Sequence, residues 1–178
     1  MPHLINKNVI NFVAFQLIWL AAVLGAAKQI VWPCIVFTAL FAAWQLSPKQ
    51  RHPNDSRLLL IALPIGLVAD SFWQISGLVQ YASAGPLSPL APIWIMMLWV
   101  AFALTFNHSL AWLKSKLWLA ALFGLFGSPL SYWAGSRLGA MSYLHNPWWV
   151  SIAFGISWAG IVCLLCHQGN RPKLKTTP

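Results

Sequence analysis

Acidic residues are almost absent from this chain. Of its 178 residues only Asp55 and Asp70 are acidic, and charged residues of both signs make up 7% of the sequence. A soluble domain needs more surface charge than this to remain dissolved. Hydrophobic residues make up 59% of the chain, and its mean hydropathy is +0.67. We therefore expect a single membrane-embedded domain, since no polar segment is long enough to fold separately.

Six apolar runs predict six membrane-spanning helices, because a helix needs about 20 apolar residues to cross the hydrocarbon core of a bilayer. The predicted fold is an all-α polytopic bundle of six transmembrane helices, which occupies residues 1–170. A basic tail of residues 171–178 follows, and its composition is typical of disorder. The predicted spans are residues 8–27, 30–46, 58–80, 93–113, 117–140 and 148–167.

The positive charge indicates how the chain is threaded. The formal net charge is +9, but the basic residues lie at the ends of apolar runs, so we expect no nucleic-acid partner. Lys and Arg are enriched on the cytoplasmic side of membrane proteins. Lys28 and Arg137 fall on one predicted side, and nine basic residues fall on the side that holds both termini, which we therefore predict to be cytoplasmic. These nine are Lys7, Lys49, Arg51, Arg57, Lys114, Lys116, Arg171, Lys173 and Lys175.

Clusters that carry metals, cofactors or catalysis are also scarce. Two of the three cysteines occur in Cys163-Leu164-Leu165-Cys166-His167, which has the C-x-x-C-H spacing of haem attachment. This motif lies in an apolar run at the predicted cytoplasmic end, whereas a resemblance to c-type cytochromes would place it on the other side. No phosphate-binding glycine loop, nucleophile elbow or paired carboxylate occurs. We expect no cofactor, metal or disulfide, and we favour a protein that is not an enzyme.

Asp70 is the main candidate for function, because it lies deep inside the third predicted span. An aspartate at the bilayer centre costs about 2.5–3.5 kcal/mol on insertion scales, so it needs a partner or a proton. With the outer ends of the third and fifth spans aligned, Arg137 lies about 8 Å from the depth of Asp70, within reach of a long guanidinium. An Arg137 that points outward to the interface is the alternative. The predicted binding residues are Asp70, Gln74, Ser131, Tyr132 and Arg137.

A second candidate polar site ends the fourth span near the cytoplasmic side, at Asn107, His108 and Ser109. His108 lies about 14 Å from Asp70 in depth, so the two cannot form one acid–base pair. No His, Cys or carboxylate at ligand spacing accompanies His108, which argues against a metal site. Asp55 is assigned to the polar loop before the third span. A polar helix cap is the simplest interpretation, and a proton acceptor is the alternative.

Small residues recur every four positions in the last two spans and predict close helix contacts. We find no internal repeat between the two halves of the sequence. The fifth span carries Gly127, Ser131, Gly135 and Gly139, and the sixth carries Ser151, Gly155, Ala159 and Cys163.

Four stretches together carry a resemblance to a known family. They are NFVAFQLIWLAAVLGAA, LVADSFWQISGL, LAPIWIMMLWVAFALTFNHSLAWL and GSPLSYWAGSRLGA. In this order they resemble an uncharacterised family of small six-span bacterial inner-membrane proteins, a domain of unknown function often encoded near cyclopropane-fatty-acid-synthase-like genes. The resemblance implies a location in the bacterial inner membrane and hints at lipid modification or envelope stress. It supplies no catalytic residues.

A polar cluster in a chain with so little charge indicates a functional site. We expect a non-enzymatic membrane protein that binds or moves a lipid-like or small solute, or that assists a lipid-modifying protein partner. One alternative is an intramembrane lipid-modifying enzyme that uses Asp70 or His108 as acid or base. Another is a purely structural membrane subunit. In each case the lipid bilayer is the main partner.

Overall fold

The structure is a computed structural model, and it describes residues 6–171. In this part the chain is mostly helical, as expected, with two short strands that the sequence did not predict. Of the predicted basic tail, only Arg171 lies within the described residues. The elements are α1 (Lys7–Ala27), α2 (Trp32–Gln45), α3 (Asp55–Ile75), β1 (Val79–Tyr81), α4 (Ile93–Ala103), the 3₁₀ helix η1 (Ala111–Ser115), α5 (Leu117–Arg137), β2 (Met141–Tyr143) and α6 (Pro147–Asn170).

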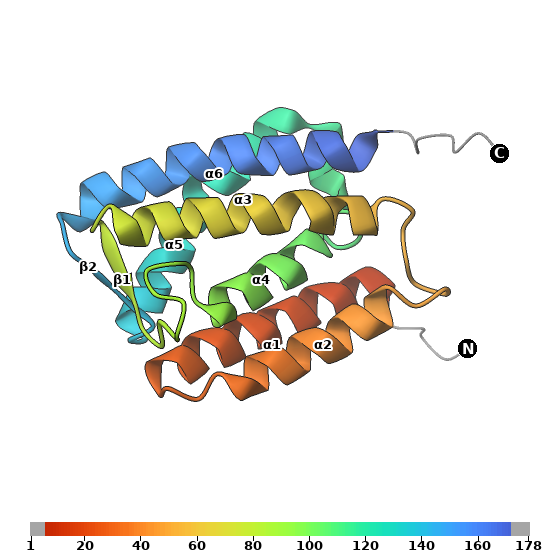
Figure 1. The fold of residues 1–178 in the computed structure, drawn as a ribbon. Coiled ribbons are helices and arrows are strands. Elements are labelled where there is room, and N and C mark those ends of the chain that lie inside the picture. Colours follow the sequence, from red (N-terminus) through yellow and green to blue (C-terminus); the bar gives the residue numbers. More distant parts are fainter. Residues whose placement is uncertain (1–5, 172–178) are drawn as a thin grey trace.

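The helices alternate in direction along one bundle (Figure 1). α1, α3 and α5 run toward one end, and α2, α4 and α6 return. α1 begins and α6 ends at the same end, which we call the terminal end; β1 and β2 lie at the opposite end, the strand end. α4 lies inside the bundle, where it contacts α1, α2 and α3.

Four helices are long and apolar enough to cross a membrane: α1, α3, α5 and α6. The other two are shorter, since α2 has 14 residues and α4 has 11. At 1.5 Å per residue these span about 21 and 17 Å, against a hydrocarbon core of about 30 Å. The predicted fourth span, residues 93–113, is α-helical only as far as Ala103 and continues as turns into η1. Six crossings therefore stay a prediction.

α3 and α5 each lead into a short strand, which gives two helix–strand units, α3 with β1 and α5 with β2. Each helix has 21 residues and ends shortly before a glycine of positive φ, +70° at Gly77 and +85° at Gly139. A left-handed residue is a common helix terminator, and a three-residue strand follows each glycine. β1 pairs with β2 in antiparallel fashion, with Gln80 opposite Ser142. The two segments share this local pattern and few identical residues, so the absence of an internal repeat between the two halves of the sequence stays a prediction.

Glycines allow three close approaches in the core. A Cβ at Gly66 of α3 would overlap the indole of Trp99, and one at Gly155 of α6 would lie 2.6 Å from the Leu125 carbonyl oxygen of α5. A Cβ at Gly124 of α5 would overlap the backbone of α6. Most of the predicted α5 stripe does not make such contacts. Its members Gly127, Ser131 and Gly135 face a cavity instead.

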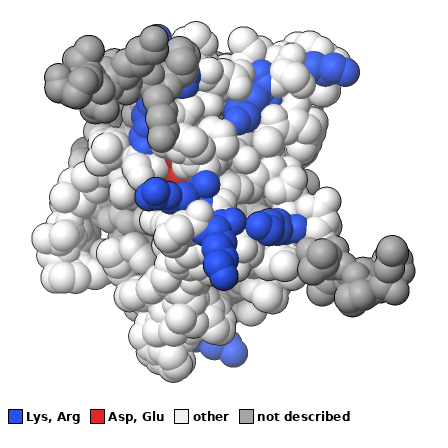
Figure 2. Space-filling view, turned by 90° about the vertical axis from the view of Figure 1, so that its right-hand side faces the viewer, with Lys and Arg blue, Asp and Glu red and all other residues white. Residues whose placement is uncertain are grey.

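Large apolar side chains cover much of the outside, which suits a protein surrounded by lipid. In the four long helices no more than 33% of the most apolar window is buried. Figure 2 views the terminal end, where Lys and Arg side chains gather. Lys28 and Arg137 are the described basic residues near the strand end. Those near the terminal end are Lys7, Lys49, Arg51, Arg57, Lys114, Lys116 and Arg171.

Candidate functional site

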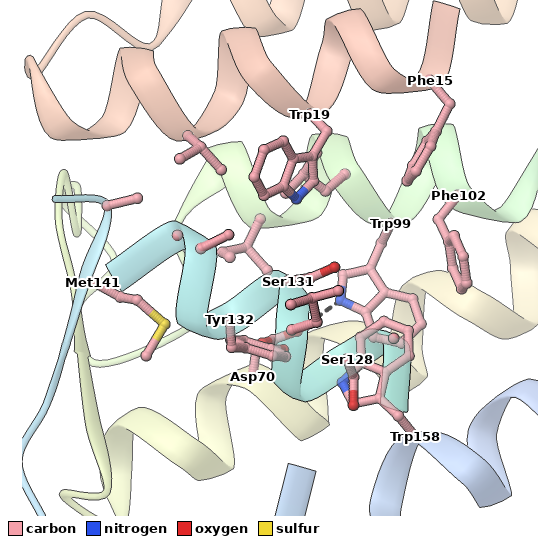
Figure 3. Close-up of a pocket in the computed structure, with 18 of the residues that line it drawn as sticks. Phe15, Trp19, Asp70, Trp99, Phe102, Ser128, Ser131, Tyr132, Met141 and Trp158 are labelled. Atoms are coloured by element: carbon pink, nitrogen blue, oxygen red, sulfur yellow. Dashed lines mark hydrogen bonds between the residues drawn. The ribbon is translucent and has the colours of Figure 1, made fainter. Parts of the chain in front are cut away.

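The Asp70 carboxylate is held in the interior by three hydrogen bonds from three other elements (Figure 3). Asp70 is 1% exposed. The hydroxyls of Tyr81 on β1 and Tyr132 on α5 each donate to Oδ1 at 2.7 Å. The indole Nε1–H of Trp99 on α4 donates to Oδ2, also at 2.7 Å. Because an ionised carboxylate only accepts hydrogen bonds, this arrangement satisfies it without a neighbouring cation.

The local sequence explains how each donor reaches Asp70. Gly66, one turn before Asp70 on α3, leaves the space that the Trp99 indole occupies. The left-handed turn at Gly77 ends α3 and brings Tyr81 back alongside it. The Tyr132 ring stacks on Phe154 of α6, with centroids 4.0 Å apart and an interplanar angle of 18°. The three donors are thus held by packing as well as by their hydrogen bonds.

A cavity of about 420 Å³ lies beside Asp70, and we call it the Asp70 cavity. It lies mainly between α1, α4, α5 and α6, and Figure 3 shows aromatic side chains converging on it. Its size is within the range of small-molecule pockets, about 300–1,000 Å³. Gln16 of α1 and Leu130 and Ser131 of α5 line it and are also exposed. Its mouth therefore lies between α1 and α5, on the side of the bundle.

Arg137 is not part of this site, contrary to the predicted pairing with Asp70. It is the last residue of α5 and is exposed, and its guanidinium carbon lies 6.0 Å from the centroid of the Trp133 ring. Among the described residues the only ion pair lies elsewhere, so Asp70 has no cationic partner there. The prediction failed because Tyr81, Tyr132 and Trp99 already surround the carboxylate, and because Arg137 points outward, as the alternative interpretation had it.

Two of the other predicted residues line the Asp70 cavity and one does not. Ser131 and Tyr132 are in its wall together with Asp70. Gln74 lies outside it, and its side-chain oxygen is buried without a hydrogen-bond partner among the described residues. Tyr81 and Trp99 were not among the predicted site residues. Their signal was weak, because Tyr81 follows the end of the third predicted span, and Trp99 is one of several tryptophans in an apolar run.

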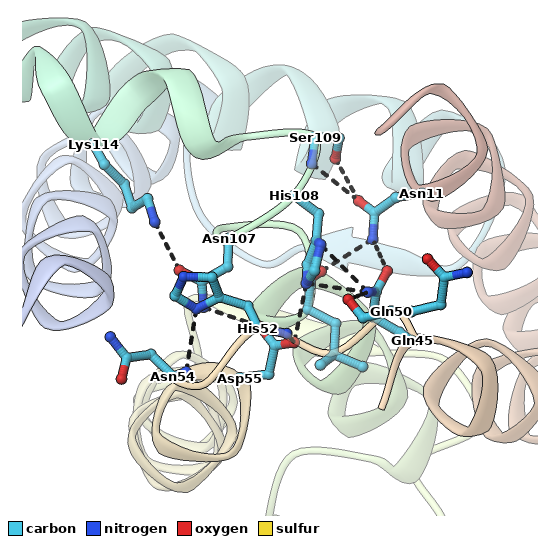
Figure 4. Close-up of polar contacts among 11 residues, drawn as sticks. Asn11, Gln45, Gln50, His52, Asn54, Asp55, Asn107, His108, Ser109 and Lys114 are labelled. Carbon is cyan, nitrogen blue, oxygen red and sulfur yellow. Dashed lines mark hydrogen bonds and ion pairs between the residues drawn. The ribbon is translucent and has the colours of Figure 1, made fainter. Parts of the chain in front are cut away.

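A second polar site, the terminal polar cluster, lies at the terminal end (Figure 4). Asp55, predicted to lie in a loop, is the first residue of α3 and is 1% exposed. His108 Nε2 lies 3.0 Å from its Oδ2, and Asn107 Nδ2 donates to its Oδ1 at 2.9 Å. Lys114 Nζ donates in turn to Asn107 Oδ1 at 2.8 Å. A carboxylate from a distant part of the chain thus lies beside His108, although none stands at ligand spacing in the sequence.

Asn11 connects this cluster to the first two helices. Its Nδ2 donates to Gln45 Oε1 of α2 at 2.7 Å, and Ser109 Oγ donates to its Oδ1 at 2.6 Å. Gln45 Nε2 also lies within 3.3 Å of both ring nitrogens of His108. The cluster thus links α1, α2, α3 and the segment after α4, and it leaves the His108 ring no nitrogen free of a protein neighbour.

His52 borders the cluster in the loop before α3. Burial lowers the pKa of its imidazole, and the positive charge of Lys114 adds to this effect, while Asp55 opposes it. The backbone N–H of Asn54 donates to His52 Nδ1 at 3.2 Å, and only an unprotonated nitrogen can accept that bond. Burial also lowers the pKa of the Lys114 amine. The environment therefore favours a neutral His52.

Residues 6–171 contain no group of three or more His, Cys, Asp or Glu side chains that could hold a metal ion. Cys163 and Cys166, in the motif with haem-attachment spacing, are free thiols in α6, and Cys34 is also free. The Cys163 thiol donates weakly to the Leu117 carbonyl oxygen at 3.5 Å. The motif therefore belongs to the packing of α6 against α5.

A family model matches residues 8–164, and the family is described as Protein of unknown function (DUF2878). The chain belongs to this family. This confirms the resemblance to an uncharacterised family carried by the four sequence stretches. No curated protein and no solved structure matches the chain. The residues of the Asp70 cavity and of the terminal polar cluster all lie within the matched part.

The two sites of this DUF2878 chain differ in what they can do chemically. The Asp70 cavity offers space, apolar walls and one carboxylate with three donors around it. The terminal polar cluster offers neighbouring charges that already contact one another. Binding needs an accessible space, and buried polar groups that are fully paired mainly stabilise the fold. The Asp70 cavity is therefore the better candidate for binding.

Proposed function

We propose that this protein binds a lipid-like or small amphiphilic solute in the Asp70 cavity, either to move it or to present it to a lipid-modifying partner. The observation that carries the proposal is the cavity of about 420 Å³ with a single buried carboxylate in an apolar wall. An ionisable group at membrane depth is costly and usually serves a function. The mouth between α1 and α5, beside Leu130 and Ser131, supports entry from the side, out of the bilayer.

We further propose that the protein resides in the bacterial inner membrane, crosses it six times and keeps both termini in the cytoplasm. The alternating course of all six α-helices between the same two ends supports six crossings (Figure 1). The excess of Lys and Arg at the terminal end supports the orientation. Exposed tryptophans near both ends, such as Trp118 and Trp148, are typical of membrane interfaces. A reporter fused to the C-terminus is expected to be active only in the cytoplasm.

Filling the cavity tests the binding proposal. A Cβ at Gly127 meets nothing within 4 Å, and Gly127 lines the cavity. Gly127→Leu should therefore place its side chain in the cavity without disturbing the helix. Gly160→Leu is the matched control, because its Cβ also meets nothing within 4 Å and Gly160 lies on α6 outside the cavity wall. Both changes favour helix formation, since leucine has a better helix propensity than glycine.

The measurement is mass spectrometry of small molecules that co-purify with the full chain in detergent. We expect a compound that is retained by the native protein and by Gly160→Leu and is at least tenfold depleted in Gly127→Leu. Equal retention by both variants would place the bound compound outside the cavity. No specifically retained compound in any of the three proteins would count against binding altogether.

The enzyme alternative has less support than binding. A histidine that acts as acid or base needs a nitrogen within hydrogen-bond reach of its substrate. In this structure Gln45 approaches both ring nitrogens of His108, and Asp55 approaches its Nε2. Asp70 is adjacent to a cavity, but the described cavity wall holds no second carboxylate and no His, Lys or Cys, and the hydroxyls of Tyr81 and Tyr132 already donate to Asp70. A structural subunit is also less well supported, because the α5 glycines Gly124, Gly127 and Gly135 face α6 or the cavity rather than an outer surface.

A further inference from the structure

We propose that the ligand of the Asp70 cavity is an apolar molecule with a single positive charge, such as a quaternary ammonium or phosphonium ion or an amine-headed amphiphile. This inference rests on the proposed binding function and names its ligand class. Three features of the cavity support it: the sign of its charge, the aromatic composition of its walls and the lack of groups that would hold an anion.

The cavity carries a single, negative charge. Asp70 is its only charged residue, and no Lys, Arg or His contributes to its wall. A buried carboxylate without an opposite charge is costly even when it is well hydrogen-bonded. The donors Tyr81, Tyr132 and Trp99 are neutral, so they stabilise the carboxylate and leave its charge uncompensated. A cationic ligand would supply the missing positive charge.

The walls suit the rest of such a ligand. Trp99 and Trp158 stack with centroids 4.8 Å apart, and Tyr132 lies edge-on to Trp158 with centroids 6.5 Å apart. Trp19 of α1 projects from the opposite side of the cavity (Figure 3). Aromatic faces attract cations, tryptophan most strongly, and quaternary ammonium groups are commonly bound in aromatic cages. An apolar cation therefore finds favourable contacts on several sides.

Anionic ligands lack partners in this cavity. Binding of phosphate or carboxylate groups typically uses Arg, Lys or a set of free backbone N–H groups. Apart from Asp70, the polar groups of the wall include Gln16, Ser128 and Ser131, and the Ser128 hydroxyl already donates to the Gly124 carbonyl oxygen at 2.9 Å. An anion would instead lie beside the like charge of Asp70. This favours a cationic ligand over an anionic lipid headgroup.

Two probes of nearly the same shape and opposite charge test the sign directly. The full chain in non-ionic detergent is titrated with tetraphenylphosphonium and with tetraphenylborate, and binding is followed by tryptophan fluorescence and calorimetry. We expect tetraphenylphosphonium to bind at least tenfold more tightly. A third titration uses dodecyltrimethylammonium, above and below its micelle concentration. Tighter binding of dodecyltrimethylammonium than of tetraphenylphosphonium would indicate a lipid-like ligand with a chain, and the reverse would indicate a compact cation.

Variants locate the site. Asp70→Asn keeps the shape of the side chain and should weaken tetraphenylphosphonium binding at least tenfold, while tetraphenylborate binds no worse. Trp19→Leu should weaken it roughly 2- to 30-fold, the range of cation–π contributions. Lys28→Gln, an exposed change of one charge near the strand end, should leave both affinities unchanged. If Asp70→Asn fails to fold, Gly127→Leu provides the occupancy test, because it should abolish binding of the cation.

The outcomes separate this inference from the proposed function. The cationic ligand would be overturned if tetraphenylborate bound as tightly as the cation or more tightly, or if Asp70→Asn kept its affinity for the cation. In that case a co-purified compound that is lost in Gly127→Leu would still support the binding site. Absence of binding by every probe, together with no co-purified compound, would overturn both. Preference for the cation that is lost in Asp70→Asn and in Gly127→Leu would support both.

Discussion

Replacing Gly66 with alanine is expected to destabilise the protein through the tryptophan that contacts Asp70. The added Cβ would overlap the Trp99 indole, so the ring must move or the two helices must separate. Either movement lengthens the 2.7 Å hydrogen bond from Trp99 to the Asp70 carboxylate. A single methyl group on α3 thus tests whether the packing of α3 against α4 positions the site.

The magnitude follows from three contributions. Overpacking a tight core typically costs about 1–3 kcal/mol, and losing a hydrogen bond to a charged group costs about 1.5–3 kcal/mol. Alanine gains about 1 kcal/mol over glycine in helix propensity. The free energy of unfolding of Gly66→Ala should therefore fall by about 1.5–5 kcal/mol. Gly160→Ala, which has open space around its Cβ, should be as stable as the native protein or gain up to about 1 kcal/mol.

The assay is denaturant unfolding in detergent micelles followed by fluorescence, with both alanine variants measured side by side. A Trp99→Phe background adds a check, because the smaller ring relieves the overlap and the indole hydrogen bond is already absent. In that background the cost of Gly66→Ala should shrink markedly, as expected for residues in contact. If Gly66→Ala is as stable as Gly160→Ala, the close packing of Trp99 against α3 is refuted.

Two further predictions concern the terminal end. Asn11→Leu should lower the free energy of unfolding by about 1–3 kcal/mol, because the buried Gln45 side chain and the Ser109 hydroxyl lose their partner. The exposed change Asn8→Leu on the same helix should cost little, and equal effects of the two changes would contradict a stabilising role of the terminal polar cluster. The lowered pKa of His52 means that the folded chain binds fewer protons than the unfolded chain, so stability should fall as the pH drops below about 6.5. The charged and titratable neighbours of His52 are Lys114, Asp55 and His108. His52→Gln should reduce the loss of melting temperature at acidic pH. An unchanged profile would show that His52 is protonated equally in the folded and unfolded states.

The composition and periodicity of the sequence predicted the helical, membrane-compatible fold, because apolar runs and their polar ends are local properties. Counting residues along the helices also predicted that Tyr132 and Ser131 lie near Asp70, and both line the cavity beside it. What the sequence could not supply was the rotation of each helix about its axis. Arg137 is close to Asp70 in predicted depth, yet it points away from the cavity.

Contacts made by loops and helix ends were the other gap. Asp55 looked like a loop residue because polar residues precede it, but α3 begins there and His108 and Asn107 meet it from a segment about 50 residues away. Tyr81 reaches Asp70 only because Gly77 ends the helix and reverses the chain. Such contacts depend on turn geometry and on partners far apart in sequence, which one sequence does not reveal.

The two helix–strand units share a local pattern around their paired strands. β1 and β2 pair with Gln80 opposite Ser142, and these positions are equivalent, since both lie three residues after the glycine that ends the preceding helix. An antiparallel pair of equivalent residues defines a local two-fold axis between the strands. Asp70 and Tyr132 are also equivalent, seven residues before Gly77 and Gly139, and they contact each other at 2.7 Å.

The two units differ at this pair, which carries the one charged side chain of the cavity wall. Tyr81 donates to Asp70, whereas the hydroxyl of its equivalent, Tyr143, is buried without a hydrogen-bond partner among the described residues. A second aspartate at position 132 would place two carboxylates within hydrogen-bond distance, where like charges disfavour ionisation of both. A tyrosine there donates to the carboxylate instead. The pair thus combines one carboxylate with one neutral donor, which suits the cationic ligand proposed above.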